Sequence, residues 1–119
     1  MTSTPKTIGE IRAAIHAGAL TAEQSVAAAL HRINAFNGKL KAFVVVDADR
    51  AMADARHLDQ LAAMGVPKGP LFGVPLAIKD IIDVAGLRTG GGSLTRKDAE
   101  VAQADAEVVT RLRLSLIHI

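Results

Sequence analysis

The stretch GPLFGVPLAIKDIID, Gly69 to Asp83, joins a loop to an apolar run that ends in charged residues. Residues 74–78 are apolar throughout, and a short run of this kind, preceded by glycine and proline, predicts a buried strand over 74–79. The run stops abruptly at Lys79 and Asp80. The lysine is therefore either the point where a strand emerges into water, paired with the aspartate, or a charged group placed at the edge of a core for chemistry. From the residues alone the ion pair is the simpler explanation.

Helices are predicted before this stretch. TIGE from Thr7 and TAEQ from Thr21 each place a threonine three residues before a glutamate or glutamine, which is the capping box that begins a helix. Gly18 is expected to end the first of these helices, and Asn37-Gly38 the second.

Two more helices complete the predicted set of about four. Asp47 or Asp49 is expected to cap a third helix, which runs to about Met64 before Gly65. Asp105 is expected to cap the last helix, over AEVVTRLR.

LKAFVVVD, residues 40–47, predicts a second strand because it is short, rich in β-branched residues and bounded by turn and cap residues. Helices alternating with strands indicate an α/β fold with two clear strands. Two strands do not form a stable sheet alone, and both are apolar on nearly every residue. We therefore expect the remaining strands of the sheet to lie outside this chain.

Composition excludes several classes of function. The 119 residues are 50% apolar and 22% charged, which is typical of a globular protein. With 3% aromatic residues and no tryptophan or tyrosine, base stacking has little to use, and the sequence gives no direct evidence for nucleic-acid binding. The absence of cysteine excludes disulfides, thiolate metal sites and a cysteine nucleophile. Without a signal peptide or a membrane-spanning run, the chain is expected to be cytoplasmic and away from membranes. The sequence gives no indication of the oligomeric state.

Other candidates for chemistry have simple structural explanations. The histidines are expected at or near the surface, and none belongs to a metal motif: His16, His31, His57 and His118. RTGGGS, residues 88–93, lacks the Gly-Lys-Ser/Thr ending of a phosphate loop and predicts a flexible loop. Asp80 and Asp83 are expected to cap a turn and to partner Lys79. Neither a cofactor nor a metal is predicted.

The longer segment GPLFGVPLAIKDIIDVAGLRTGGGS resembles the amidase signature family, whose members carry G-P-L-x-G-[VI]-P-x-[AS]-[IV]-K-D-x-[IFY]-D followed by spaced Gly, Thr and Gly-Ser. The likeness extends over about Thr7 to Arg113. The matching residues are Gly69, Pro70, Leu71, Gly73, Val74, Pro75, Ala77, Ile78, Lys79, Asp80, Ile82, Asp83, Gly86, Thr89, Gly92 and Ser93. A motif of this length and discontinuity is specific.

The resemblance implies a mixed β-sheet covered by helices and a hydrolase that cleaves the carbon–nitrogen bond of small-molecule amides. It further implies a triad of nucleophilic serine, cis-serine and lysine, in which Lys79 corresponds to the catalytic lysine. Ser93 matches a family position that is not catalytic. In the family, both catalytic serines and the oxyanion loop lie in a Gly/Ser-rich segment downstream of the point where this sequence stops, at Ile119.

We therefore expect residues 1–113 to be the N-terminal part of an amidase domain that is inactive alone. Residues 114–119, LSLIHI, depart from the family pattern and are expected to be a non-native tail. Two alternatives stay open. One is a fragment of the synthetase-independent glutamyl/aspartyl-tRNA amidotransferase, from its amidase-like chain, and the other is a small helical interaction module.

Overall fold

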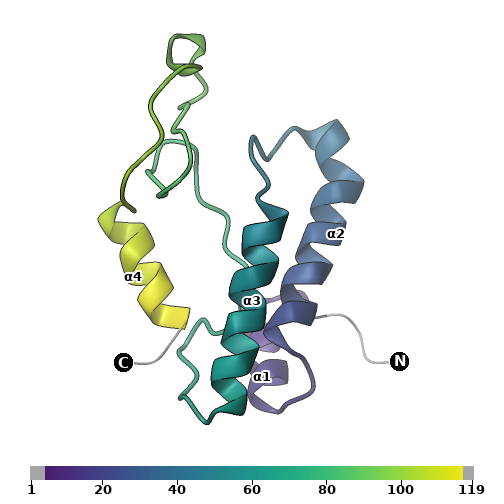
Figure 1. The fold of residues 1–119 in the computed structure, drawn as a ribbon. Coiled ribbons are helices and arrows are strands. Elements are labelled where there is room, and N and C mark those ends of the chain that lie inside the picture. Colours follow the sequence, from purple (N-terminus) through teal and green to yellow (C-terminus); the bar gives the residue numbers. More distant parts are fainter. Residues whose placement is uncertain (1–4, 117–119) are drawn as a thin grey trace. The chain divides into compact units, whose positions relative to one another are not determined.

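The computed structural model describes residues 5–116, which fall into two compact units. The first unit contains residues 5–75 together with 115–116, and the second contains residues 76–114. Helices α1 (Ile8–His16), α2 (Ala22–Leu40) and α3 (Ala48–Ala63) belong to the first unit (Figure 1). The second unit contains the 3₁₀ helix η1 (Leu94–Arg96) and nearly all of α4 (Glu107–Leu116).

The first two helices begin at the predicted capping boxes. The Thr7 hydroxyl accepts the Glu10 N–H at 3.2 Å, and the Glu10 carboxylate accepts the Thr7 N–H at 3.1 Å. Thr21 and Gln24 make the same reciprocal pair at 3.1 and 3.0 Å. Both predictions are confirmed because a capping box is a local structure, formed by side chains three residues apart on one turn.

The predicted end of α2 is wrong by a few residues. The helix continues past Asn37-Gly38 to Leu40, and Lys41 ends it in the left-handed conformation, with φ 52°. The Asn37 side chain donates to the Phe43 carbonyl at 3.0 Å and accepts the Phe43 N–H at 2.8 Å. Asn37 thus fastens the chain after the helix to the last turn from within the helix, and does not end the helix itself.

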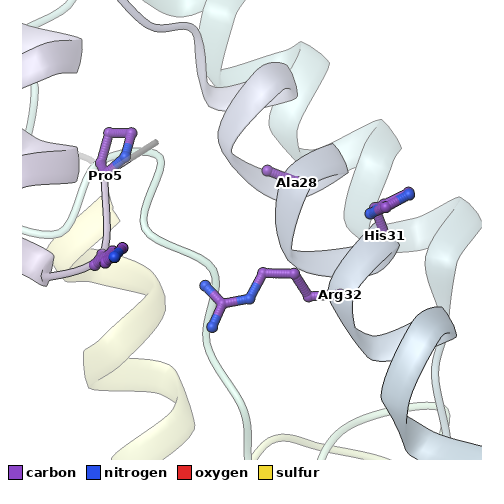
Figure 2. A pocket seen from close by; sticks show the side chains of 5 residues that line it. Pro5, Ala28, His31 and Arg32 are labelled. Carbon is purple, nitrogen blue, oxygen red and sulfur yellow. The ribbon is translucent and has the colours of Figure 1, made fainter. Parts of the chain in front are cut away.

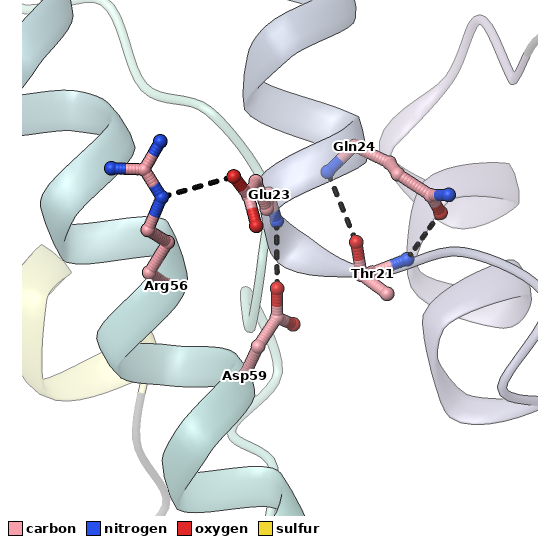
Figure 3. Close-up of polar contacts among 5 residues, drawn as sticks. All are labelled: Thr21, Glu23, Gln24, Arg56 and Asp59. Carbon is pink, nitrogen blue, oxygen red and sulfur yellow. Dashed lines mark hydrogen bonds and ion pairs between the residues drawn. The ribbon is translucent and has the colours of Figure 1, made fainter.

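Helices α2 and α3 lie side by side in the first unit (Figure 1). The N-cap of α3 is Asp47, one of the two predicted caps, and Gly65 follows the helix with φ 81°. The two helices are also joined by polar contacts near the start of α2 (Figure 3). The Asp59 carboxylate of α3 accepts the backbone N–H groups of Ala22 and Glu23, at 2.8 and 3.0 Å.

The core of the first unit gathers side chains from all three helices and from the loop after α3. Its buried members are Ile15, Ala22, Ala55, Leu58 and Phe72, and Ile11, Leu20, Val26 and Ala62 pack against them. Phe72 has the largest fully buried side chain, at 1% exposure. The loop places it there through a turn at Gly73, whose φ is 72°. A Cβ at Gly73 would collide with the Ile15 side chain and lie 3.2 Å from the Ala22 Cβ.

The two predicted strands are not confirmed: residues 5–116 contain no strand, although one isolated antiparallel bridge joins Arg88 and Val101. Residues 44–46 are instead an exposed apolar segment, with Val44 76% exposed. The physical reason is that an extended segment becomes a strand only when a neighbouring strand pairs with its backbone. The local pattern favours extended structure, but neither segment has such a neighbour in the described part of the chain.

Helix α4 begins at Glu107, two residues after the predicted cap. The Asp105 carboxylate accepts the Ala85 N–H at 2.8 Å and pairs with Arg113 at 2.7 Å. It therefore joins the preceding loop to the helix. The helix also includes 114–116 of the expected tail, whereas 117–119 and His118 lie outside the described residues. That the tail is non-native stays a prediction.

Candidate active site

Lys79 stands where the apolar run meets solvent. Exposure rises along the run, from 7% at Val74 to 42% at Leu76, and Lys79 is exposed. The expected ion pair with Asp80 is not formed: among the described residues the Lys79 ammonium has no hydrogen-bond or ion-pair partner. The lysine therefore presents a free amine on a backbone that continues directly into the glycine-rich loop.

The aspartate after the lysine binds the glycine loop. The Asp80 Oδ1 accepts the Gly90 N–H at 2.9 Å, and the Asp80 carbonyl accepts the Gly91 N–H at 2.7 Å. The Lys79 carbonyl accepts the Ile82 N–H at 3.0 Å, which closes a turn over the same residues. Asp80 thus holds the loop and leaves the lysine unpaired. The turn predicted here is confirmed, and the pairing with lysine is wrong.

Asp83 connects the same turn to two later segments. The Thr89 hydroxyl donates to its carboxylate, and its carbonyl accepts the Ala106 N–H at 2.9 Å, just before α4. The Thr89 carbonyl in turn accepts from Arg96 Nε at 3.1 Å. The loop predicted to be flexible is therefore hydrogen-bonded at several points within the second unit.

Ser93 has a structural contact of its own. Its hydroxyl caps η1 by accepting the Thr95 N–H at 3.3 Å, and it also lies 2.8 Å from the Thr95 hydroxyl. No base adjoins this serine in the described part of the chain, because its side-chain partner is another hydroxyl. These contacts agree with a non-catalytic role for Ser93.

A pocket of about 380 Å³ lies in the first unit and does not include Lys79 (Figure 2). Ala28, His31 and Arg32 of α2 line one side, and Pro5 and Lys6 lie opposite. The walls carry basic groups but no carboxylate or hydroxyl side chain. The pocket therefore lacks the acids and nucleophiles that hydrolysis requires.

Residues 5–116 contain no cluster of three or more histidine and carboxylate groups that could hold a metal. His57 is exposed, as predicted, and His16 is exposed with its Nδ1 2.9 Å from the Arg12 carbonyl. Within the same residues no helix is long and apolar enough to cross a membrane.

Comparison with known proteins assigns the chain to a family. A family model described as Amidase matches residues 24–117, which is most of the sequence and includes the whole Lys79 segment. The chain belongs to the amidase family. The resemblance identified from the sequence motif is thereby confirmed, and amidase, hydrolase and carbon–nitrogen bond chemistry are the setting of this family.

Among curated relatives, the A-type subunit of the glutamyl-tRNA(Gln) amidotransferase from Chromohalobacter salexigens is 41% identical over 108 residues, 91% of this chain and 22% of that protein. AmiB2 of Mycobacterium bovis, an amidase by name, is 46% identical over 96 residues, 81% of this chain and 20% of that protein. The chain thus spans about a fifth of these relatives and corresponds to their N-terminal part.

Among solved structures, a peptide amidase in complex with chymostatin is 33% identical, with a TM-score of 0.80 over 89% of this chain and 22% of that one. The neighbours have α/β folds, so the coarse prediction of an α/β amidase fold is confirmed, although the chain itself supplies helices and loops.

The sequence identified Lys79 and its segment but missed the role of Asp80. Its bonding partners are glycines ten and eleven residues later, a separation that matches no helical or strand period. The available signal was the combination of an aspartate next to the lysine with a run of three glycines downstream, since backbone N–H groups of a glycine loop are accessible donors for a carboxylate.

Proposed function

We propose that this chain is the lysine-bearing N-terminal part of an amidase that hydrolyses the carbon–nitrogen bond of small carboxamides. The observation that supports it is the family match across residues 24–117, within which Lys79 stands at the position of the family's catalytic lysine. Residues 1–113 would then be part of the amidase domain, and the catalytic serines would come from the part that follows in the longer relatives.

In this proposal Lys79 is the general base. Its neutral amine takes a proton from the bridging serine, which takes one from the nucleophilic serine as that oxygen attacks the amide carbonyl. Ammonia or an amine leaves, and water hydrolyses the acyl-enzyme. Backbone N–H groups outside this chain would stabilise the oxyanion. An exposed lysine without an ion-pair partner suits this role, because an ion pair would hold the amine in its protonated form.

The test is a chimera in which residues 7–113 replace the matching segment of the peptide amidase. We expect the chimera to hydrolyse peptide amides, and Lys79→Ala to lower kcat by at least about 10³-fold, as loss of one member of a catalytic triad does. Lys97→Ala is the matched control, because Lys97 is also exposed and lies in the same unit. An active Lys79→Ala chimera would refute the assignment of the base.

A second candidate is favoured by the 41% identity to the A-type subunit of an amidotransferase. In that case the parent would release ammonia from glutamine for transfer within a larger complex. The same residues placed in the Chromohalobacter salexigens relative separate the two candidates. If ammonia release from glutamine is restored there while the peptide amidase chimera stays inactive, the amidotransferase is the better assignment.

A further inference from the structure

Asp80 uses both its side chain and its backbone to bind one short segment of the glycine loop. Oδ1 accepts the Gly90 N–H at 2.9 Å, and the main-chain carbonyl accepts the Gly91 N–H at 2.7 Å. Hydrogen bonds from an N–H group to a carboxylate are among the stronger ones in proteins. Two bonds to consecutive residues also fix an orientation, which one bond alone leaves free.

The loop is shaped to fit closely around this carboxylate. A Cβ at Gly90 would lie 2.9 Å from Asp80 Oδ2, closer than real Cβ contacts allow. Gly91 and Gly92 have φ values of 61° and 68°, in the left-handed region that favours glycine. The run of three glycines, which has no repeat or phosphate-loop explanation, is therefore accounted for by the approach of the loop to Asp80.

The consequence for Lys79 follows from the backbone. The Lys79 carbonyl is bound by the Ile82 N–H at 3.0 Å, and the next carbonyl, that of Asp80, is bound by Gly91. The peptide unit that follows Lys79 is thus fixed at both ends, whereas the lysine side chain has no partner among the described residues. A fixed backbone with a free amine is what a base needs if it is to meet a serine supplied by another part of the polypeptide.

We propose that Asp80 is a positioning residue for Lys79: by holding Gly90 and Gly91 it fixes the backbone from which the lysine amine projects. The proposal rests on the assignment of Lys79 as the base. Asp80 touches neither the reacting atoms nor the lysine amine, and it acts through the loop.

The first test measures backbone order in the full chain by ¹⁵N relaxation. In the wild type the Lys79 amide should have an order parameter of about 0.85, and Asp80→Ala should lower it towards about 0.6. Asp80→Asn should largely restore the rigid value, because the amide oxygen still accepts the Gly90 N–H. Asp98→Ala, a change at an exposed aspartate of the same unit, should leave Lys79 unaffected.

A second variant reaches the same bond from the other side. Gly90→Ala leaves Asp80 intact but displaces its carboxylate, so it should loosen Lys79 as Asp80→Ala does. Gly38→Ala is the matched control, because nothing lies within 4 Å of its added Cβ. If Gly90 and Gly91 become mobile in these variants while Lys79 keeps its order parameter, Asp80 orders only the loop and the proposal is wrong.

The second test uses the peptide amidase chimera. Asp80→Ala should lower kcat about 10- to 100-fold with KM changed less than about twofold, because a displaced base impairs the chemical step and leaves substrate binding intact. Asp80→Asn should recover most of the rate. A rise in KM at unchanged kcat would contradict the positioning role. An inactive parent chimera would count against the proposed function, while the relaxation result would still decide whether Asp80 orders Lys79.

Discussion

The carboxylate of Asp59, in α3, accepts the backbone N–H of Ala22, the first residue of α2, at 2.8 Å, although 37 residues separate them. Its second oxygen accepts the next N–H, that of Glu23, at 3.0 Å. Helices leave their first N–H groups without intrahelical partners, and their positive dipole end favours a negative charge. Asp59 therefore caps a helix other than its own, and it joins α2 to α3 beside the buried Ala22 (Figure 3).

We predict that Asp59→Ala lowers the free energy of unfolding by about 2 kcal/mol, because two charge-assisted hydrogen bonds are lost at a part-buried site. The chain lacks tryptophan and tyrosine, so urea unfolding followed by the circular dichroism of its helices is the suitable measurement. Asp98→Ala, at an exposed position, is the control. Equal stability of the two variants would show that Asp59 is dispensable.

The start of α1 should be sensitive to acid. The backbone N–H groups of Lys6 and Thr7, at 2.7 and 3.1 Å, hold the pKa of the Glu10 carboxyl below its ordinary value. A depressed pKa in the folded state stabilises the helix start above the unfolded value of about 4.3, and this contribution is lost as the pH falls through the folded pKa. We predict that ¹³Cα shifts at residues 8–11 lose helical character as Glu10 titrates.

Helix α2 provides the matched comparison, because the same capping box is closed there by Gln24, which does not titrate. Glu10→Gln should therefore make the start of α1 insensitive to pH while preserving the box. An α1 that loosens in acid equally with and without the substitution would place the titrating group elsewhere.

Gly73 is required where the loop turns to bury Phe72. We predict that Gly73→Ala lowers the free energy of unfolding by about 2 kcal/mol or more, because it combines left-handed backbone strain with overpacking against Ile15 and Ala22. Gly38→Ala should do the opposite and add roughly 0.5–1 kcal/mol, since it replaces a helical glycine in open space. If both substitutions change stability in the same direction, steric exclusion at Gly73 is not the cause.

Local features of this fold were predictable from the sequence, and distant ones were not. Thr7 and Thr21 lie three residues from their partners, so the spacing alone identified both helix starts. Asp59 resembles any polar residue of a helix, because its role depends on the packing of α2 against α3. The end of α2 was misplaced for a related reason: Asn37 bonds Phe43, six residues later, and a glycine in the last turns is tolerated.

The candidate site divides in the same way. Lys79 was identified because it belongs to a contiguous motif of recognisable residues. The partners of Asp80 were missed because they lie across a loop whose course the local pattern does not determine. The strands over 40–47 and 74–79 were overpredicted, since the propensity of residues such as Val44 to Val46 is realised only when another strand is present.

The last prediction is that this chain alone hydrolyses no amides, although it contains the lysine that the proposed mechanism requires. Ser93 caps η1 through Thr95, and no other serine matches the family's nucleophile or bridging serine, so no acyl acceptor is available. The oxyanion donors would also be missing, and loss of a single donor typically costs about 10²–10³ in kcat. Members of a triad act as a unit, so an isolated lysine retains little of their effect. The measurement is ammonia release from aliphatic and aromatic amides by the purified chain, beside Lys79→Ala and Ser93→Ala. Turnover above buffer that disappears in both variants would overturn the prediction, because it would mean that Ser93 leaves its capping contact and forms a site with Lys79.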